Sequence, residues 1–192
     1  MSLWYSPPAV RQPPLPVPVL RPQLPGHPFR AWTETLAISA VLRGEQRLSD
    51  LLNGRAVLTA EQVSSVPHGS GWAAAVRQDE ALLDPFDLDL VLGGALDAVT
   101  ALERAARRVY KVRYPVLVEG RGFEVRGLVH LFPGNAPEFM LNHTGALFFP
   151  VTEALVRRSG RIVSDRATDV ALVNRFAVRG IRQLDSLDER AF

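Results

Sequence analysis

The chain contains no cysteine and almost no lysine, and it lacks any long hydrophobic run. The absence of cysteine among its 192 residues excludes disulfides, thiolate metal sites and cysteine nucleophiles. No segment approaches the roughly 18 consecutive apolar residues of a membrane span, and the N-terminus lacks the basic and apolar regions of a secretion signal. These absences predict a cytoplasmic protein without a membrane span.

Arginine supplies nearly all of the positive charge, because Lys111 is the only lysine among 22 basic residues. The formal net charge is only +2, and 47% of the residues are hydrophobic, which is typical of a globular protein with a buried core. The arginine bias has two explanations, a compositional one from the genome or habitat and a functional one from phosphate recognition by guanidinium groups. We favour the compositional explanation.

Residues 1–28 are predicted to form a proline-rich extended arm. Nine of the fifteen prolines lie in residues 7–28, and proline at this density disfavours helices and sheet ladders and favours polyproline II. Trp4 and Tyr5 precede this stretch and are candidates to anchor the arm in a pocket of a partner, since large aromatic residues carry much of the energy of small interfaces. The alternative is a frayed terminus.

The rest of the chain has the pattern of short β-strands. Between 123 and 131, Val125, Gly127, Val129 and Leu131 alternate with more polar residues, which places them on one face of a strand. A second run, 147–155, is rich in the aromatic and β-branched residues that strands favour. A loop containing proline and glycine separates the two runs.

Two parts of the chain resemble each other in sequence. Residues 48–63 match 137–155, with Leu52-Asn53 over Leu141-Asn142 and 59–63 over 151–155, and residues 72–88 match 169–185. Blocks repeated in the same order indicate a tandem duplication. We therefore expect two related β-barrel repeats, in residues 29–92 and 114–192.

A helix is predicted between the copies, over residues 93–113. Apolar residues recur there at helical spacing, and basic residues gather near its end, where they complement the helix dipole. The same basic residues are the candidate contacts for a partner, RNA included. They are Arg104, Arg107, Arg108, Lys111 and Arg113.

The strand segments VLVEG, FEVRGLVHL, FFPVTEALV and VALVNRFAVRGI resemble the small β-barrels of the Sm-like and SH3-like type. More closely, they resemble an uncharacterised group of bacterial tandem small β-barrel proteins that carry a proline-containing loop, "LN" and "hPhTDA", where h is hydrophobic. Here these motifs are Leu141-Asn142 and residues 149–154. The resemblance implies small barrels, and for the Sm-like relatives ring assembly and RNA binding. The Sm RNA-contact motif has no counterpart in this chain.

Candidate catalytic residues are few. His27, His68, His130 and His143 show no metal-ligand spacing. Gly69-Ser70 followed by Asp87 and Asp89 resembles the nucleotidyltransferase signature, in which a Gly-Ser turn holds a triphosphate and alternate carboxylates on one strand bind Mg²⁺. The separation is longer than usual, and the repeat explains the same segment without any catalytic role.

The sequence thus predicts a mainly β (α+β) protein of two small Sm-like/SH3-like barrels joined by one helix and preceded by the arm. We expect a non-catalytic binding or assembly module that associates with itself or another protein through its barrels and arm. An RNA-binding Sm-like protein and a nucleotidyltransferase-like enzyme are the alternatives. No cofactor and no metal site are expected outside that enzyme hypothesis.

Overall fold

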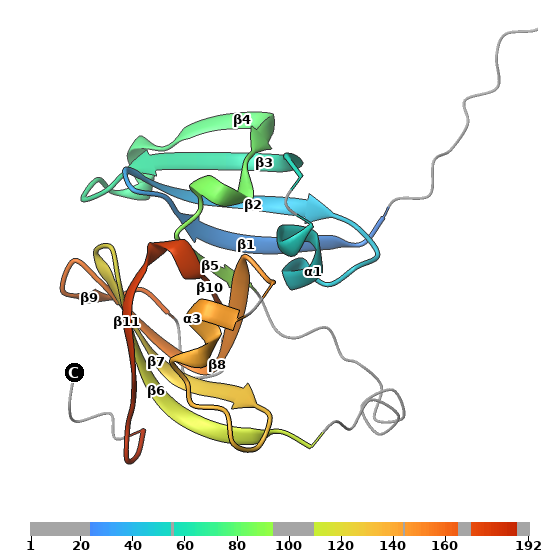
Figure 1. The fold of residues 1–192 in the computed structure, drawn as a ribbon. Helices are drawn as coiled ribbons and strands as arrows, with labels where there is room; N and C mark the ends of the chain where they lie inside the picture. Colours follow the sequence, from blue (N-terminus) through green and yellow to red (C-terminus); the bar gives the residue numbers. More distant parts are fainter. Residues whose placement is uncertain (1–23, 55, 94–109, 144, 165–169, 188–192) are drawn as a thin grey trace, which may run out of the picture.

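The structure, a computed structural model, describes residues 24–54, 56–93, 110–143, 145–164 and 170–187. These residues form a mainly β protein built on one antiparallel sheet of eleven strands (Figure 1). The predicted β class is confirmed. The sheet does not close on itself, so the two closed barrels expected from the sequence are not confirmed; instead, the two copies share one sheet.

The first half, residues 24–93, contains five strands, one short α-helix and two 3₁₀ turns. Its helix lies between the second and third strands, and one 3₁₀ turn leads into the fifth strand. The elements in chain order are β1 (Gly26–Trp32), β2 (Leu36–Arg43), α1 (Leu48–Asn53), β3 (Leu58–Pro67), η1 (Trp72–Ala74), β4 (Val76–Leu83), η2 (Pro85–Asp87) and β5 (Leu90–Gly93).

The second half, residues 110–187, repeats this order of elements. A short helix again follows the second strand, and a 3₁₀ turn again precedes the last. The elements are β6 (Val112–Gly120), β7 (Phe123–Leu131), α3 (Phe139–His143), β8 (Phe148–Arg158), β9 (Arg161–Ile162), β10 (Val170–Asn174), η3 (Arg175–Ala177) and β11 (Val178–Gln183).

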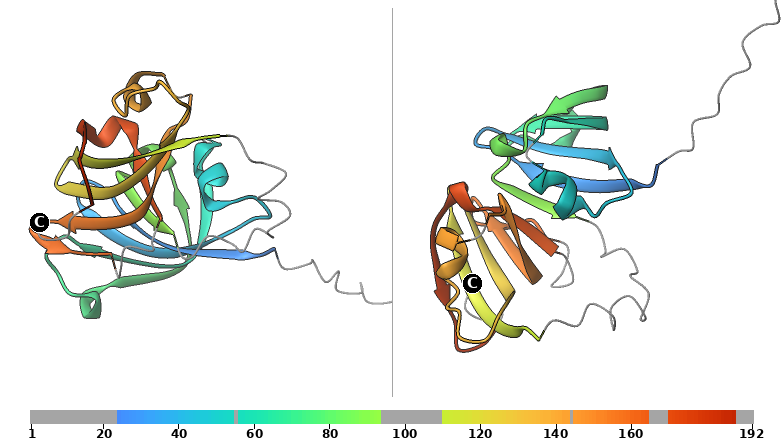
Figure 2. Two further views of the ribbon diagram at one scale, coloured as in Figure 1. Left: turned by 90° about the horizontal axis from the view of Figure 1, so that it is seen from below. Right: turned by 45° about the vertical axis from the view of Figure 1, so that its right-hand side comes forward.

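The strands of the two halves are also arranged in the same order. The first half runs β5-β1-β2-β3-β4, and the second runs β11-β6-β7-β8, with both β9 and β10 paired to β8. Together β9 and β10 take the place that β4 has in the first half. Figure 2 shows the two halves as separate layers that meet where β5 lies beside β10.

A backbone irregularity fixes the equivalence between the halves. Gln62 in β3 and Glu153 in β8 both have positive φ, 53° and 52°, and each lies at a register shift against the preceding strand. An L-residue rarely adopts this conformation, and a β-bulge is where it is tolerated. The two bulges therefore mark one structural position that occurs in both copies.

Strand pairing extends this equivalence to β4 and β10. Four residues before the bulges, Leu58 pairs with Leu83, and Phe149 pairs with Val173. Residues 81–87 (ALLDPFD) thus correspond to 171–177 (ALVNRFA). The internal sequence match aligned 72–88 with 169–185 and 59–63 with 151–155. The first of these alignments is wrong by seven residues, and the second is wrong by one.

The 3₁₀ turns confirm the corrected alignment. The side chain of Asp84 accepts a hydrogen bond from the N–H of Phe86 at 2.9 Å, and Asn174 accepts one from the N–H of Phe176 at 3.0 Å. A short polar side chain that satisfies the first free N–H is the usual way to begin such a turn. Asp84 and Asn174 are therefore equivalent residues.

Several predicted boundaries differ from the structure. β1 begins at Gly26, before the predicted end of the arm at residue 28. The strand therefore includes Pro28, but its neighbour β5 pairs only with Phe29–Trp32 and does not extend to the proline. A proline there costs no ladder bond on that side. The predicted joining helix lies mostly in residues 94–109, outside the described residues. β6 begins at Val112, so Arg113 is on a strand and not on a helix.

Candidate assembly interface

The two halves meet through β5 and β10, which pair in antiparallel register from Val170 opposite Gly93 to Val173 opposite Leu90. β5 is almost completely buried, because β1 covers one edge, β10 covers the other and side chains cover both faces. In terms of the repeat, the fifth strand of one half pairs with the fourth strand of the other. We call this contact the junction.

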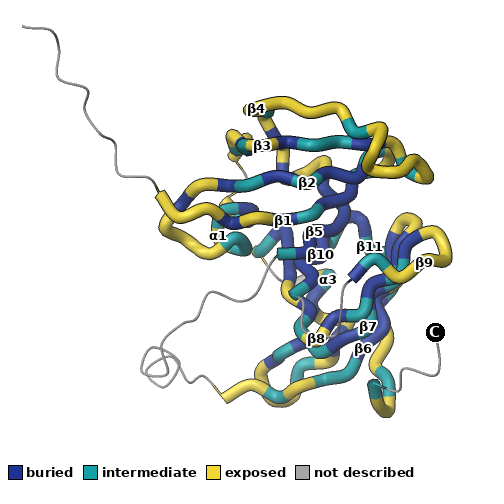
Figure 3. Tube along the Cα trace, turned by 180° about the vertical axis from the view of Figure 1, so that it is seen from behind, coloured by how far each residue is buried: buried dark blue, intermediate teal, exposed yellow. Residues whose placement is uncertain are grey.

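Apolar side chains of the second half complete the core of the first half at the junction. Leu147, Phe148 and Leu172 belong to the same buried cluster as Ile38, Leu42, Leu52 and Leu88 of the first half. Figure 3 shows that most of β5 and β10 is buried where the two halves meet. Burying a large apolar side chain stabilises a fold by about 1.5 to 3 kcal/mol, so these three residues bind the halves firmly together.

Asn53, the last residue of α1, bonds to the main chain of the second half. Its Nδ2 donates to the carbonyl oxygen of Phe148 at 3.1 Å, and its Oδ1 accepts from the N–H of Phe148 at 2.7 Å. One side-chain amide thus satisfies both main-chain groups of a residue at the start of β8, as a neighbouring strand would. This contact explains the role of the "LN" motif in the first copy.

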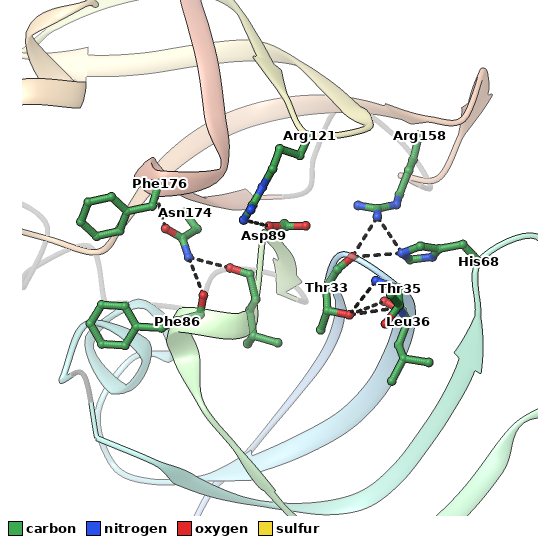
Figure 4. A network of polar contacts seen from close by, with 11 residues as sticks. Thr33, Thr35, Leu36, His68, Phe86, Asp89, Arg121, Arg158, Asn174 and Phe176 are labelled. Atoms are coloured by element: carbon green, nitrogen blue, oxygen red, sulfur yellow. Dashed lines mark hydrogen bonds and ion pairs between the residues drawn. The ribbon is translucent and has the colours of Figure 1, made fainter.

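Asn174 makes a second amide contact across the junction. While its Oδ1 caps η3, its Nδ2 donates to the carbonyl oxygen of Leu88 at 2.8 Å, just before β5 (Figure 4). Its equivalent Asp84 is exposed, and an ionised carboxylate has no hydrogen to donate. The same position is therefore a donor at the junction and only an acceptor in the first half.

Charged side chains from both halves also meet at the junction. Asp89, nearly fully buried, accepts from Arg121 at 2.8 Å, and Arg158 donates to the carbonyl oxygen of Thr33 at 2.9 Å and to Nε2 of His68 at 2.7 Å (Figure 4). Burial lowers the pKa of Arg158 from its usual value, while the charge of Asp89 opposes that shift. These contacts position the turns of the two halves against each other.

Two polar atoms of this charged group are buried without a hydrogen-bond partner among the described residues. They are Oδ2 of Asp89 and Nη1 of Arg158. Their charges are opposite, and each residue already uses another polar atom within the group, Oδ1 of Asp89 and Nη2 of Arg158. The group is thus built for attachment of the halves rather than for an open site.

The sheet ends at β4 on one side and at β11 on the other. Among the described residues, each of these strands pairs along one edge only, β4 with β3 and β11 with β6. β4 is equivalent to β10, and β11 is equivalent to β5. The free edges are therefore the same two kinds of strand that pair at the junction.

Equivalent residues differ sharply in burial between the junction and the β4 edge. Leu172 is 3% exposed whereas its equivalent Leu82 is 74% exposed, and Phe148 is 1% exposed whereas its equivalent Val57 is 57% exposed. Leu82 and Val57 are thus apolar although they are exposed, and their equivalents in the second half are buried. The β4 edge therefore keeps the chemistry of a contact surface.

Most of the partner-binding residues predicted from the sequence lie outside the described residues. This holds for Trp4, Tyr5, Arg104, Arg107 and Arg108. Nζ of Lys111 lies 5.7 Å from the centre of the Phe132 ring, and Arg113 pairs with His130 in the ladder of β6 and β7. Lys111 and Arg113 therefore belong to the β6 end of the sheet rather than to a basic helix.

His130 has an unusual environment for a strand residue. Its Nε2 lies 2.9 Å from Oγ1 of Thr152, whose hydroxyl donates to the carbonyl oxygen of Leu128, so the histidine is the donor in this pair. Burial, and then the charges of Arg113 and Lys111, lower the pKa of His130, while Glu153 opposes them. The surroundings therefore favour the neutral form of the ring.

The carboxylates of the nucleotidyltransferase hypothesis do not form a common site. Asp87 lies in η2 and is exposed, whereas Asp89 is buried and paired with Arg121. Gly69 and Ser70 belong to the turn after β3. Among the described residues, no group of three or more histidines or acidic residues could hold a metal ion. The geometry gives this alternative no support.

The sequence comparison had marked the repeated "LN" but gave no sign of its partner, Phe148, or of the buried charged group. Comparison with known proteins found no matching family model, no matching curated protein and no matching solved structure. No helix in the described part of the chain has the length and apolar character needed to cross a membrane. The interface itself therefore carries the functional argument.

Proposed function

We propose that the protein is a non-catalytic assembly module whose copies associate head to tail through their free sheet edges. In this contact β11 of one copy pairs with β4 of the next, as β5 pairs with β10 at the junction. The observation that carries the proposal is the exposure of Leu82, an apolar residue whose equivalent Leu172 is buried at the junction. The predicted arm, in residues outside the description, is not needed for this contact.

The junction fixes the register that the contact between copies would have. Leu172 lies opposite Val91 and Val170 opposite Gly93. Transferred through the repeat, Leu82 lies opposite Ile181 and Glu80 lies opposite Gln183. The contact joins an apolar pair and places the carboxylate of Glu80 beside the neutral amide of Gln183, which suits cross-strand pairing. A free strand edge is a ready template for such pairing.

A contact between two different edges is heterologous, so it leaves a free edge at each end of any open assembly. Such a contact produces a closed ring when its rotation closes and a filament when it does not. Charged side chains on β4, namely Arg77, Asp79 and Glu80, restrict which strands can pair with it. The proposal therefore describes selective self-association rather than general aggregation.

The test is the mass of the full chain as a function of concentration, measured by sedimentation velocity. Leu82→Lys should weaken association about 10- to 100-fold, because it removes an apolar contact and places a charge in the pairing. Val76→Lys is the matched control: Val76 is also exposed on β4 but lies outside the four residues that are equivalent to the paired part of β10. A protein that stays monomeric at all concentrations, or equal effects of the two variants, would contradict the proposal.

A further inference from the structure

In the second copy of the "LN" motif, Leu141 packs against the core of its own half, whereas the side chain of Asn142 has no hydrogen-bond partner among the described residues. Asn142 in α3 is equivalent to Asn53 in α1, since each follows a leucine near the end of the helix between the second and third strands. Asn53 bonds to both main-chain groups of Phe148. The side chain of Asn142 is exposed and makes no hydrogen bond to the described residues.

The repeat identifies what the amide of Asn142 would bind. Phe148 directly precedes Phe149, and Phe149 is equivalent to Leu58. The residue equivalent to Phe148 is therefore Val57, which is exposed and lies just before β3. At the junction, Asn53 lies in the first half, which contributes its fifth strand, β5. Its target, Phe148, lies in the second half, which contributes its fourth strand, β10.

In the head-to-tail contact, the asparagine and the main-chain residue that it binds belong to two different copies. The copy that contributes β11 also contributes α3, and the copy that contributes β4 also contributes Val57. We infer that the Asn142 amide is a docking site for the main chain of Val57 in a second copy of this chain. This inference rests on the proposed function, because it requires the β4 and β11 edges to pair.

The chemistry of the side chain fits this role. The asparagine amide has a donor and an acceptor on one planar group, which matches the N–H and carbonyl of one main-chain residue. Leu52, next to Asn53, is fully buried at the junction, whereas the equivalent Leu141 is only partly buried. If Val57 of a second copy took the place that Phe148 has at the junction, it would cover Leu141 as fully as Leu52 is covered.

The contact would also select the partner. Strand pairing alone is tolerant of sequence, whereas an amide that must meet one main-chain residue fixes both the register and the direction of the added strand. Asn142 is thus a specificity-determining residue for assembly. Its loss should weaken association without weakening the fold of a single copy.

Three variants of the full chain test this inference by sedimentation velocity, with thermal unfolding of the dilute protein as the second readout. Asn142→Ala and Asn142→Asp should each weaken association about tenfold, because the alanine removes both hydrogen bonds and the aspartate removes the donor. The melting temperature of the dilute protein should not change. Asn135→Ala is the matched control, since it removes an amide from the same half outside the motif, and it should have no effect.

Asn53→Ala calibrates the readouts, because its target is in the same copy. It should lower the melting temperature even in dilute solution. If Leu82→Lys weakens association but both Asn142 variants leave it unchanged, the docking inference is overturned and the proposed function stands. If Leu82→Lys has no effect, or the chain does not associate, both are overturned. An Asn142 variant that unfolds the dilute protein would show a role within one copy and would also overturn the inference.

Discussion

The fourth strands of the two halves, β4 and β10, occupy the same place in the repeat but have opposite surroundings. β10 is covered by β5, and Leu172 on it is buried, whereas β4 ends the sheet and its equivalent Leu82 is open to solvent. The difference teaches that this type of strand pairs on both edges in the second half, and that the described residues provide β10, but not β4, with a partner on its outer edge. Substitutions at equivalent positions on the two edges test whether β4 and β10 present the same kind of surface.

The largest expected effect separates Phe148 from its equivalent Val57. Phe148→Ala should lower the free energy of unfolding by about 3 to 5 kcal/mol, because a buried ring at the junction would be replaced by a cavity. Val57→Ala should change it by less than about 0.5 kcal/mol in dilute protein, since Val57 is exposed there. Urea unfolding measures both. Similar losses for the two variants would show that Val57 is already buried within one copy.

A smaller effect is expected from making the two edges more alike. Asp84→Asn would give the β4 edge the donor that Asn174 provides at the junction, where it bonds the carbonyl oxygen of Leu88. In the contact between copies the equivalent carbonyl belongs to Val178. The variant should therefore strengthen association by roughly 2- to 10-fold, the worth of one ordinary hydrogen bond. Asp79→Asn, which also removes a charge from β4, is the control, and an equal gain there would point to net charge instead.

The smallest effect concerns a pair of equivalent cross-strand contacts. Arg43 and Glu61 form an ion pair in the first half at 2.9 Å, and the equivalent residues of the second half are His130 and Thr152. The pKa of His130 is lowered from 6.5 by burial and by Arg113 and Lys111, so the unfolded chain binds a proton more readily than the folded one. Stability should therefore fall as the pH drops below 6.5.

His130→Gln should remove this part of the pH dependence, because glutamine keeps a donor for Thr152 and does not titrate. Urea midpoints measured between about pH 7.5 and pH 5.5 would show it. Arg43→Gln should leave the slope over that range unchanged, since it leaves His130 and its surroundings in place. A slope that survives in His130→Gln would assign the pH dependence to another group.

Local features of the fold were predictable from the sequence, whereas the contacts between distant strands were not. The alternation of Val125, Gly127, Val129 and Leu131 correctly indicated a strand, and the matching of Asn53 with Asn142 correctly indicated a repeat. These signals depend on near neighbours in the chain. The match of 72–88 with 169–185 was wrong because the fourth strand is continuous in one half and split into β9 and β10 in the other.

The open sheet was not predictable for a related reason. Whether a small sheet closes on itself or continues into the next depends on which edges meet, and the pairing of β5 with β10 joins residues that are far apart in the chain. Periodicity places Leu172 on a strand but does not say which strand covers it. Of the predicted basic cluster, Arg104, Arg107 and Arg108 lie outside the described residues, whereas Lys111 and Arg113 lie at β6, because the strand starts before Tyr114-Pro115.

The most direct test of the account is a cross-link between two copies at the predicted register. Glu80 and Gln183 should lie directly opposite each other, and cross-strand neighbours are close enough for a disulfide. The chain has no cysteine, so Glu80→Cys and Gln183→Cys variants each carry a single thiol. Mixed and oxidised, they should give a covalent dimer on a non-reducing gel, while either variant alone should not. No dimer in the mixture, or equal dimer from one variant alone, would contradict head-to-tail pairing of β4 with β11.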